Sequence, residues 1–116
     1  MNWKTINSEA SLEEVKAASH KQRILIFKHS TRCSISAMAL NRMERAWNES
    51  EMQGLTPYFL DLIAYRPISN KVAADFGVQH ESPQVLVIEN GECIYNTSHM
   101  GINYQELKQF ASISTN

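Results

Sequence analysis

A short apolar run that ends in a polar turn most strongly constrains how this chain can fold. Residues 24–29, ILIFKH, begin with a continuous apolar stretch of strand length, as expected for a strand buried on both faces of a sheet. The turn HSTRC follows at once, and apolar residues then recur at helical spacing from Ile35 to Trp47. This order predicts that Cys33 lies where a central strand passes into a helix.

The segments on either side of this junction continue the alternation of strand and helix. WKTI, residues 3–6, is predicted to form a short edge strand, and the next helix is expected to carry Ser11 and Glu14 as its capping-box pair. TPYFLDLI, residues 56–63, indicates a second central strand. A helix with Pro67 in its first turn is then expected to end at Gly77.

The last part of the chain predicts a hairpin and a final helix. In VLVIENGECIYN, residues 85–96, two β-rich runs flank Asn90 and Gly91, the pair that a type I′ turn prefers. Asn103 and Glu106 are then expected to cap a helix. The order predicts one α/β domain over residues 1–116, with a thioredoxin-like fold: a mixed central sheet of four to five strands flanked by four helices.

Composition excludes several classes of function. The 116 residues include 11 basic and 12 acidic side chains, without a block of like charge, so neither nucleic acid nor a membrane is expected as a partner. The first residues have no apolar core of a signal peptide, and no apolar run approaches the length of a membrane span. Two cysteines do not make a disulfide framework, which fits a reducing compartment, so we expect a cytoplasmic protein.

Cys33 is the candidate nucleophile. At the start of a helix, the first backbone N–H groups have no partner within the helix, and the helix dipole adds partial positive charge, so both favour a thiolate. Lys28 and Arg32 act in the same direction if their side chains reach the sulfur. The polar neighbours argue for exposure, against the alternative of a small buried residue. Cys93, between apolar residues of the hairpin, is interpreted as structural.

Three further residues near the junction allow two interpretations each. His29 either supports the thiolate or is a buried structural histidine. Ser36 completes a C-x-x-S pattern, cannot form a disulfide with Cys33, and either donates a hydrogen bond to the thiolate or is merely a polar helix residue. Pro83, just before the strand QVLVI, is either a trans proline or a cis proline that turns the backbone of Ser82 toward Cys33, where an extended substrate can pair with it.

Three segments, TRCSIS (31–36), IAYRPISN (63–70) and HESPQ (80–84), in this order resemble the YtxJ-type monothiol bacilliredoxins, thioredoxin-like proteins. The resemblance spans nearly the whole chain. It implies an enzyme for thiol–disulfide exchange, in which Cys33 takes bacillithiol, or a similar low-molecular-weight thiol, from S-thiolated client proteins and is reset by a reducing thiol or reductase. It implies no permanently bound cofactor and no metal. Thr31, Arg32, Ser34, Ser36 and His29 would support Cys33, and Ser82, Pro83 and Arg66 would bind the substrate.

The chain departs from the more common family pattern Thr-Cys-Pro-Ile-Ser, because Arg32 precedes the cysteine and Ser34 replaces proline. Ser34 restores one backbone N–H near the sulfur and loosens the turn. Three alternatives remain open. One is an iron–sulfur carrier like the monothiol glutaredoxins, although PQVLVIENGE replaces their glycine-rich segment. Another is a metal site formed by Cys33, His29 and His80, and the third is a thioredoxin-like domain that only binds partners.

Overall fold

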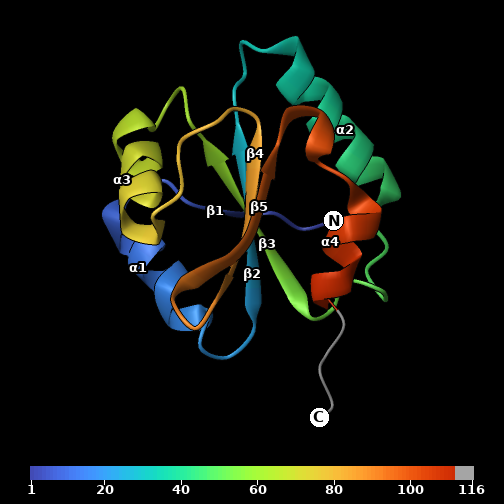
Figure 1. The fold of residues 1–116 in the computed structure, drawn as a ribbon, viewed down its shortest axis with the longest axis horizontal. Coiled ribbons are helices and arrows are strands. Elements are labelled where there is room, and N and C mark those ends of the chain that lie inside the picture. Colours follow the sequence, from blue (N-terminus) through green and yellow to red (C-terminus); the bar gives the residue numbers. More distant parts are fainter. Residues whose placement is uncertain (112–116) are drawn as a thin grey trace.

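The computed structural model describes residues 1–111 as a mixed five-stranded sheet between two pairs of helices (Figure 1). Helices α1 and α3 cover one face of the sheet, and α2 and α4 cover the other. The strand order is β1-β3-β2-β4-β5. The elements are β1 (Lys4–Thr5), α1 (Glu9–Ala18), β2 (Arg23–His29), α2 (Ser34–Ala46), β3 (Leu55–Asp61), α3 (Arg66–Phe76), β4 (Gln84–Glu89), β5 (Glu92–Ser98), the short 3₁₀ helix η1 (His99–Gly101) and α4 (Tyr104–Ala111). The predicted fold class is confirmed.

Strand β2 lies at the centre and fixes which ends of the chain segments meet. It pairs in parallel with β3, where His29 lies opposite Asp61, and antiparallel with β4, where Lys28 lies opposite Gln84. The carboxyl ends of β2 and β3 therefore lie beside the start of β4. Consequently, the turn before α2, the loop before α3 and the loop before β4 all leave the sheet at one end.

Alternate residues of β2 enter two separate cores, because successive side chains of a strand point to opposite faces. Leu25 and Phe27 pack in the core beneath α2 and α4. Ile24 and Ile26 pack in the core beneath α1 and α3. By the same alternation, His29 belongs to the α2–α4 face and Lys28 to the α1–α3 face, although both side chains are buried.

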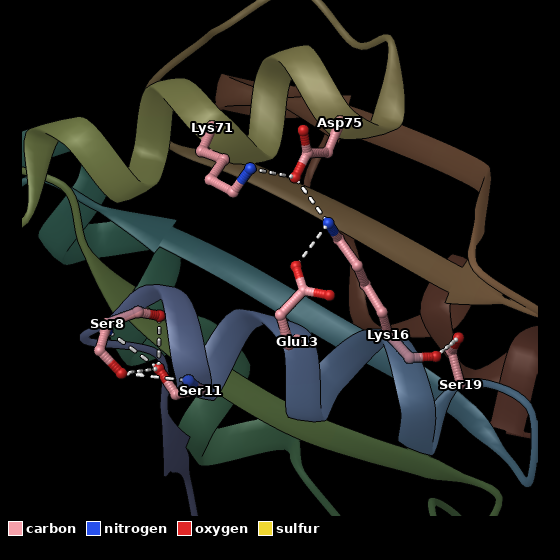
Figure 2. Close-up of polar contacts among 7 residues, drawn as sticks. All are labelled: Ser8, Ser11, Glu13, Lys16, Ser19, Lys71 and Asp75. Carbon is pink, nitrogen blue, oxygen red and sulfur yellow. Dashed lines mark hydrogen bonds and ion pairs between the residues drawn. The ribbon is translucent and has the colours of Figure 1, made fainter.

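The start of α1 differs from the sequence-based prediction. Ser8, not Ser11, is the N-cap, and its side chain accepts the N–H of Ser11 at 3.0 Å. The Ser11 hydroxyl in turn accepts the N–H of Ser8 at 3.0 Å, so a serine takes the place of the glutamate that a capping box usually has (Figure 2). The predicted pair of Ser11 and Glu14 is therefore wrong, because the helix begins one turn earlier than its apolar residues indicate.

Strand β3 also ends earlier than predicted. The Asp61 carboxylate accepts the N–H groups of Ile63 and Ala64, at 3.0 and 3.1 Å, and so bends the chain into a turn. The predicted strand over residues 56–63 is therefore too long at its end, although Leu62 is buried as an apolar residue.

The later elements agree with the sequence-based predictions in most respects. Pro67 lies in the first turn of α3, and Gly77 ends that helix in the left-handed conformation at φ 64°. Asn90 and Gly91 both have positive φ, at 53° and 77°, as a type I′ turn requires. Asn103 caps α4 through its side-chain oxygen. The Glu106 carboxylate instead accepts a hydrogen bond from the Tyr95 hydroxyl at 3.3 Å.

Figure 2 shows how charged side chains join α1 to α3, the two helices that cover one face of the sheet. The ammonium of Lys16 contacts Glu13 on its own helix at 2.9 Å and Asp75 on α3 at 2.6 Å, and Lys71 also contacts Asp75. Surface ion pairs of this kind each contribute less than ~1 kcal/mol, so the buried core holds the two helices in place. Within residues 1–111, no helix is long and apolar enough to cross a bilayer.

The cap of α1 yields a first prediction. Ser8→Ala removes the acceptor for the Ser11 N–H, so we expect the free energy of unfolding to fall by about 1 kcal/mol. Glu14→Ala is the matched control, because Glu14 is exposed and takes no part in the observed cap, and it should change that free energy by less than about 0.5 kcal/mol. Urea unfolding measures both. A larger loss in the Glu14 variant would contradict the observed cap.

Candidate active site

Cys33 occupies the N-cap position of α2, between a strand-like backbone and the first helical turn. Within residues 1–111, the N–H groups of Ser34, Ile35 and Ser36 have no hydrogen-bond partner, and the first N–H that bonds back is that of Ala37, to the Cys33 carbonyl. A side-chain acceptor at an N-cap ordinarily receives such N–H groups. Cys33 is partly exposed and not in a disulfide. A thiolate at this position faces unpaired donors and the positive end of a 13-residue helix.

Ser36 is fully buried, and its hydroxyl is turned toward the end of β2. Its oxygen lies 2.7 Å from Nδ1 of His29 and accepts the backbone N–H of Ser30 at 3.0 Å. These two contacts join the first turn of α2 to the strand that precedes it. One of the two roles predicted for the Ser36 hydroxyl is to donate a hydrogen bond to the Cys33 thiolate. In the structure, this hydroxyl instead contacts His29 and Ser30 and so forms a clamp between β2 and α2.

His29 lies in an aromatic environment that favours the structural interpretation. Its ring centroid is 5.5 Å from that of Phe59 and 6.3 Å from that of Phe27. Burial lowers the pKa of His29, and the carboxylates of Asp61 and Glu44 oppose this shift only in part. The imidazole is therefore neutral near pH 7. It holds Ser36 in place rather than supplying a positive charge to the sulfur.

The loop before β4 contributes an unpaired stretch of backbone. The Ser82–Pro83 peptide bond is cis. The Pro83 carbonyl accepts the N–H of His99, whereas neither the N–H nor the carbonyl of Ser82 has a hydrogen-bond partner within residues 1–111. The hydroxyl of Ser82 is buried and unpaired in that same part of the chain. This loop adjoins the turn that carries Cys33, because β2 and β4 are neighbours.

The other proposed site residues lie at the same end of the sheet but on its surface. Thr31 and Arg32 form the exposed turn after β2, and Ser34 is the exposed first residue of α2. Arg66 is the exposed first residue of α3, which begins beyond the end of β3. The fold therefore gathers these residues around one end of the sheet.

Lys28 and His80 form a contact that the sequence analysis did not predict. Lys28 is fully buried, and its Nζ lies 3.3 Å from Nδ1 of His80, on the face covered by α1 and α3. The Lys28 ammonium thus contacts His80 and not the Cys33 sulfur. Burial and the positive charge of Arg66 lower the pKa of Lys28 from 10.5 to about 8. The sequence contained one sign of this contact, a lysine that directly follows the continuous apolar run of residues 24–27.

Cys93 differs from Cys33 in its place in the fold, although both thiols are free and partly exposed. It is half-buried in β5, and its Sγ donates to the Tyr95 carbonyl at 3.3 Å. Burial raises the pKa of its thiol. Cys93 pairs with Ile88, which pairs with Ile24, and this places it at the opposite end of the sheet from Cys33. Ile88 lies four positions after Gln84 along β4, a span of about 13 Å.

The alternative of a metal site is not supported by the positions of its ligands. His29 and His80 contact residues on opposite faces of the sheet, Ser36 and Lys28 respectively. Across residues 1–111, no three His, Cys, Asp or Glu side chains converge as a metal site would need.

Comparison with known proteins agrees with this arrangement. The family model described as "Monothiol bacilliredoxin BrxC" matches residues 4–107. A solved structure, described as a thioredoxin fold with a proposed oxidoreductase activity, superposes with a TM-score of 0.78 at 29% identity, over 94% of this chain and 93% of that one. The thioredoxin of Malassezia sympodialis has a TM-score of 0.75 at 16% identity, over 96% and 92%. That of Fasciola hepatica has 0.67 at 17%, over 91% and 93%.

The clamp between Ser36 and His29 yields a prediction for stability. Ser36→Ala leaves Nδ1 of His29 and the N–H of Ser30 buried without their partner, so we expect a loss of about 2 kcal/mol in the free energy of unfolding. Ser34→Ala, an exposed serine in the same helical turn, is the control and should lose less than about 0.5 kcal/mol. Equal losses in denaturant unfolding would show that the clamp contributes nothing.

The pKa of Lys28 predicts how stability depends on pH. Because the folded-state pKa is lowered, the folded state bears the unfavourable buried charge below about pH 8 and releases that proton before the unfolded state does as the pH rises. A shift from 10.5 to about 8 corresponds to about 3 kcal/mol. We expect Lys28→Met to be more stable than the wild type at pH 7, with the difference shrinking by about that amount toward pH 10.5. A difference that does not change with pH would contradict the assignment.

Proposed function

Because this chain belongs to the monothiol bacilliredoxin family and is a thioredoxin-fold protein of thiol redox function, we propose that it removes bacillithiol, or a similar low-molecular-weight thiol, from S-thiolated proteins. The observation that carries the proposal is the position of Cys33. It occupies the N-cap position of α2, beside N–H groups that have no partner within residues 1–111. A buried serine, Ser36, lies where a second cysteine would resolve the intermediate.

The first step is an exchange of disulfide bonds without net oxidation. The Cys33 thiolate attacks the sulfur of the small thiol in the client's mixed disulfide. A bond forms between Cys33 and the small thiol while the client's S–S bond breaks, and the client sulfur leaves as a thiolate that takes a proton from water. The unpaired N–H groups at the start of α2 stabilise the Cys33 thiolate before attack and when it leaves again.

The second step needs a thiol from outside the molecule. Ser36 has no sulfur, and Cys93 lies at the far end of the sheet with a pKa raised by burial. A reducing thiol or a reductase therefore attacks the small thiol's sulfur in the mixed disulfide on Cys33 and supplies the two electrons. Cys33 leaves as a thiolate, and the small thiol leaves as a disulfide with the attacking sulfur. The protein works as a carrier between the client and this reductant, and we propose no bound cofactor.

The unpaired backbone of Ser82 supports a role in holding the client. Its N–H and carbonyl are free within residues 1–111 and lie next to the turn of Cys33. An extended segment around the client cysteine can pair with these two groups as an added strand does. The sulfur of that segment then approaches Cys33 from the side of the Pro83 loop.

The two cysteines allow a direct test of this function. Incubation with oxidised bacillithiol, and separately with oxidised glutathione, should add one small thiol per chain to the wild type and to Cys93→Ser, as measured by intact mass. Cys33→Ser should gain no mass, because its nucleophile is gone. The adduct on the wild type should persist until a reducing thiol is added, since no second sulfur is in reach. An inactive Cys93 variant, or spontaneous loss of the adduct, would contradict the one-cysteine mechanism.

A further inference from the structure

Lys28 is a fully buried lysine that lacks a carboxylate partner within residues 1–111. Its contact in that part of the chain is with a ring nitrogen of His80. Burying an ammonium group without an opposite charge is unfavourable, and such charges in proteins are normally paired. The mechanism above gives Lys28 no role, so its charge needs another explanation.

The strand places this charge at the reactive end of the sheet. Lys28 follows Ile24 and Ile26 on the face covered by α1 and α3, and it lies opposite Gln84, the first residue of β4. Cys33 lies five positions after it along the chain, and the cis proline immediately precedes Gln84. A group bound near Lys28 therefore lies at the same end of the sheet as Cys33.

The backbone on both sides of His80 is held in place by Gln84. The buried side chain of Gln84 donates to the Gln79 carbonyl at 3.0 Å and accepts the N–H of Glu81 at 3.4 Å, so both neighbours of His80 are fixed. A lysine ammonium can only donate, so Nδ1 of His80 must be the acceptor in their contact. The ring proton of the neutral imidazole then resides on Nε2, which becomes a hydrogen-bond donor directed away from Lys28.

Arg66 adds a second positive charge to this region. It is exposed, it begins α3, and its guanidinium has no carboxylate partner within residues 1–111. Burial, Lys28 and Arg66 together lower the pKa of His80, against the opposing charge of Glu81. On the next turn of α3, the hydroxyl of Ser69 is fully buried and also unpaired in the described chain. The positive charges of Lys28 and Arg66 thus both act on His80, where the carboxylate of Glu81 is the opposing charge.

We infer that Arg66 and Nε2–H of His80, with the ammonium of Lys28 behind them, bind a carboxylate of the small thiol that Cys33 receives. The guanidinium and the imidazole supply hydrogen-bond donors, and the buried lysine supplies charge and fixes the imidazole tautomer. This inference rests on the proposed function and deepens it, because it makes the preferred co-substrate an acidic thiol. These residues determine specificity and take no part in the exchange of disulfide bonds.

A pair of small symmetrical disulfides that differ in charge tests the inference. The rate of adduct formation on Cys33 is measured with anionic 3,3′-dithiodipropionate and with neutral 2-hydroxyethyl disulfide, and their ratio is compared among variants. Arg66→Ala and Lys28→Met should each lower the ratio about tenfold, the change expected when one charge-assisted hydrogen bond is lost. Lys21→Ala is the matched control, since it removes one exposed positive charge at the other end of β2 and should leave the ratio unchanged.

The outcomes separate the subsite from the proposed function. An unchanged ratio in Arg66→Ala, whose side chain is exposed and not needed for folding, overturns the subsite while the exchange chemistry stands. If the wild type reacts with neither disulfide, the proposed function fails, and titration of Cys33→Ser with succinate, followed by the His80 ring resonances, decides the subsite separately. A shift that Arg66→Ala abolishes supports the subsite, and resonances that do not move overturn it.

Discussion

The pairing of β2 with both of its neighbours determines where every reactive group of this protein lies. A parallel ladder to β3 and an antiparallel ladder to β4 bring three loops to one end of the sheet. These loops carry Cys33, the cis proline and the start of α3. If the β2–β4 register shifted by one residue, Lys28 would no longer lie opposite Gln84, and the fixed position of His80 would be lost. The site therefore depends on backbone hydrogen bonds more than on any single side chain.

Much of this architecture follows from the sequence, because local rules and topology agree. The continuous apolar run of β2, the first-turn position of Pro67 and the Asn90–Gly91 turn each have a direct physical basis, and the structure has all three. Cys33 at a strand–helix junction was predictable for the same reason. The errors lie at element ends. The start of α1 and the end of β3 are set by the side chains of Ser11 and Asp61, which form local hydrogen bonds that periodicity does not encode.

The contacts that give the site its character could not be predicted from spacing. Ser36 is in the sequence position of a resolving cysteine, yet its hydroxyl bonds to His29 and Ser30, seven and six residues earlier. The partner of Lys28 lies 52 residues away and is positioned by Gln84, whose own contacts depend on the loop before β4. Such contacts between distant residues arise from tertiary packing, so a single sequence indicates the residue types but not which of them meet.

The two faces of the sheet give the reactive end two different chemical environments. On the α2–α4 face, a neutral histidine and a serine hold the helix that carries Cys33, and among residues 1–111 no Lys, Arg, Asp or Glu is buried on that face. On the α1–α3 face, a lysine without a carboxylate partner in residues 1–111 contacts a histidine, and an exposed arginine begins α3. Cys33 follows the end of β2, a strand that contributes buried residues to both faces. In the proposed function, contacts on one face hold the geometry of the nucleophile, and the cationic groups on the other face select the small thiol.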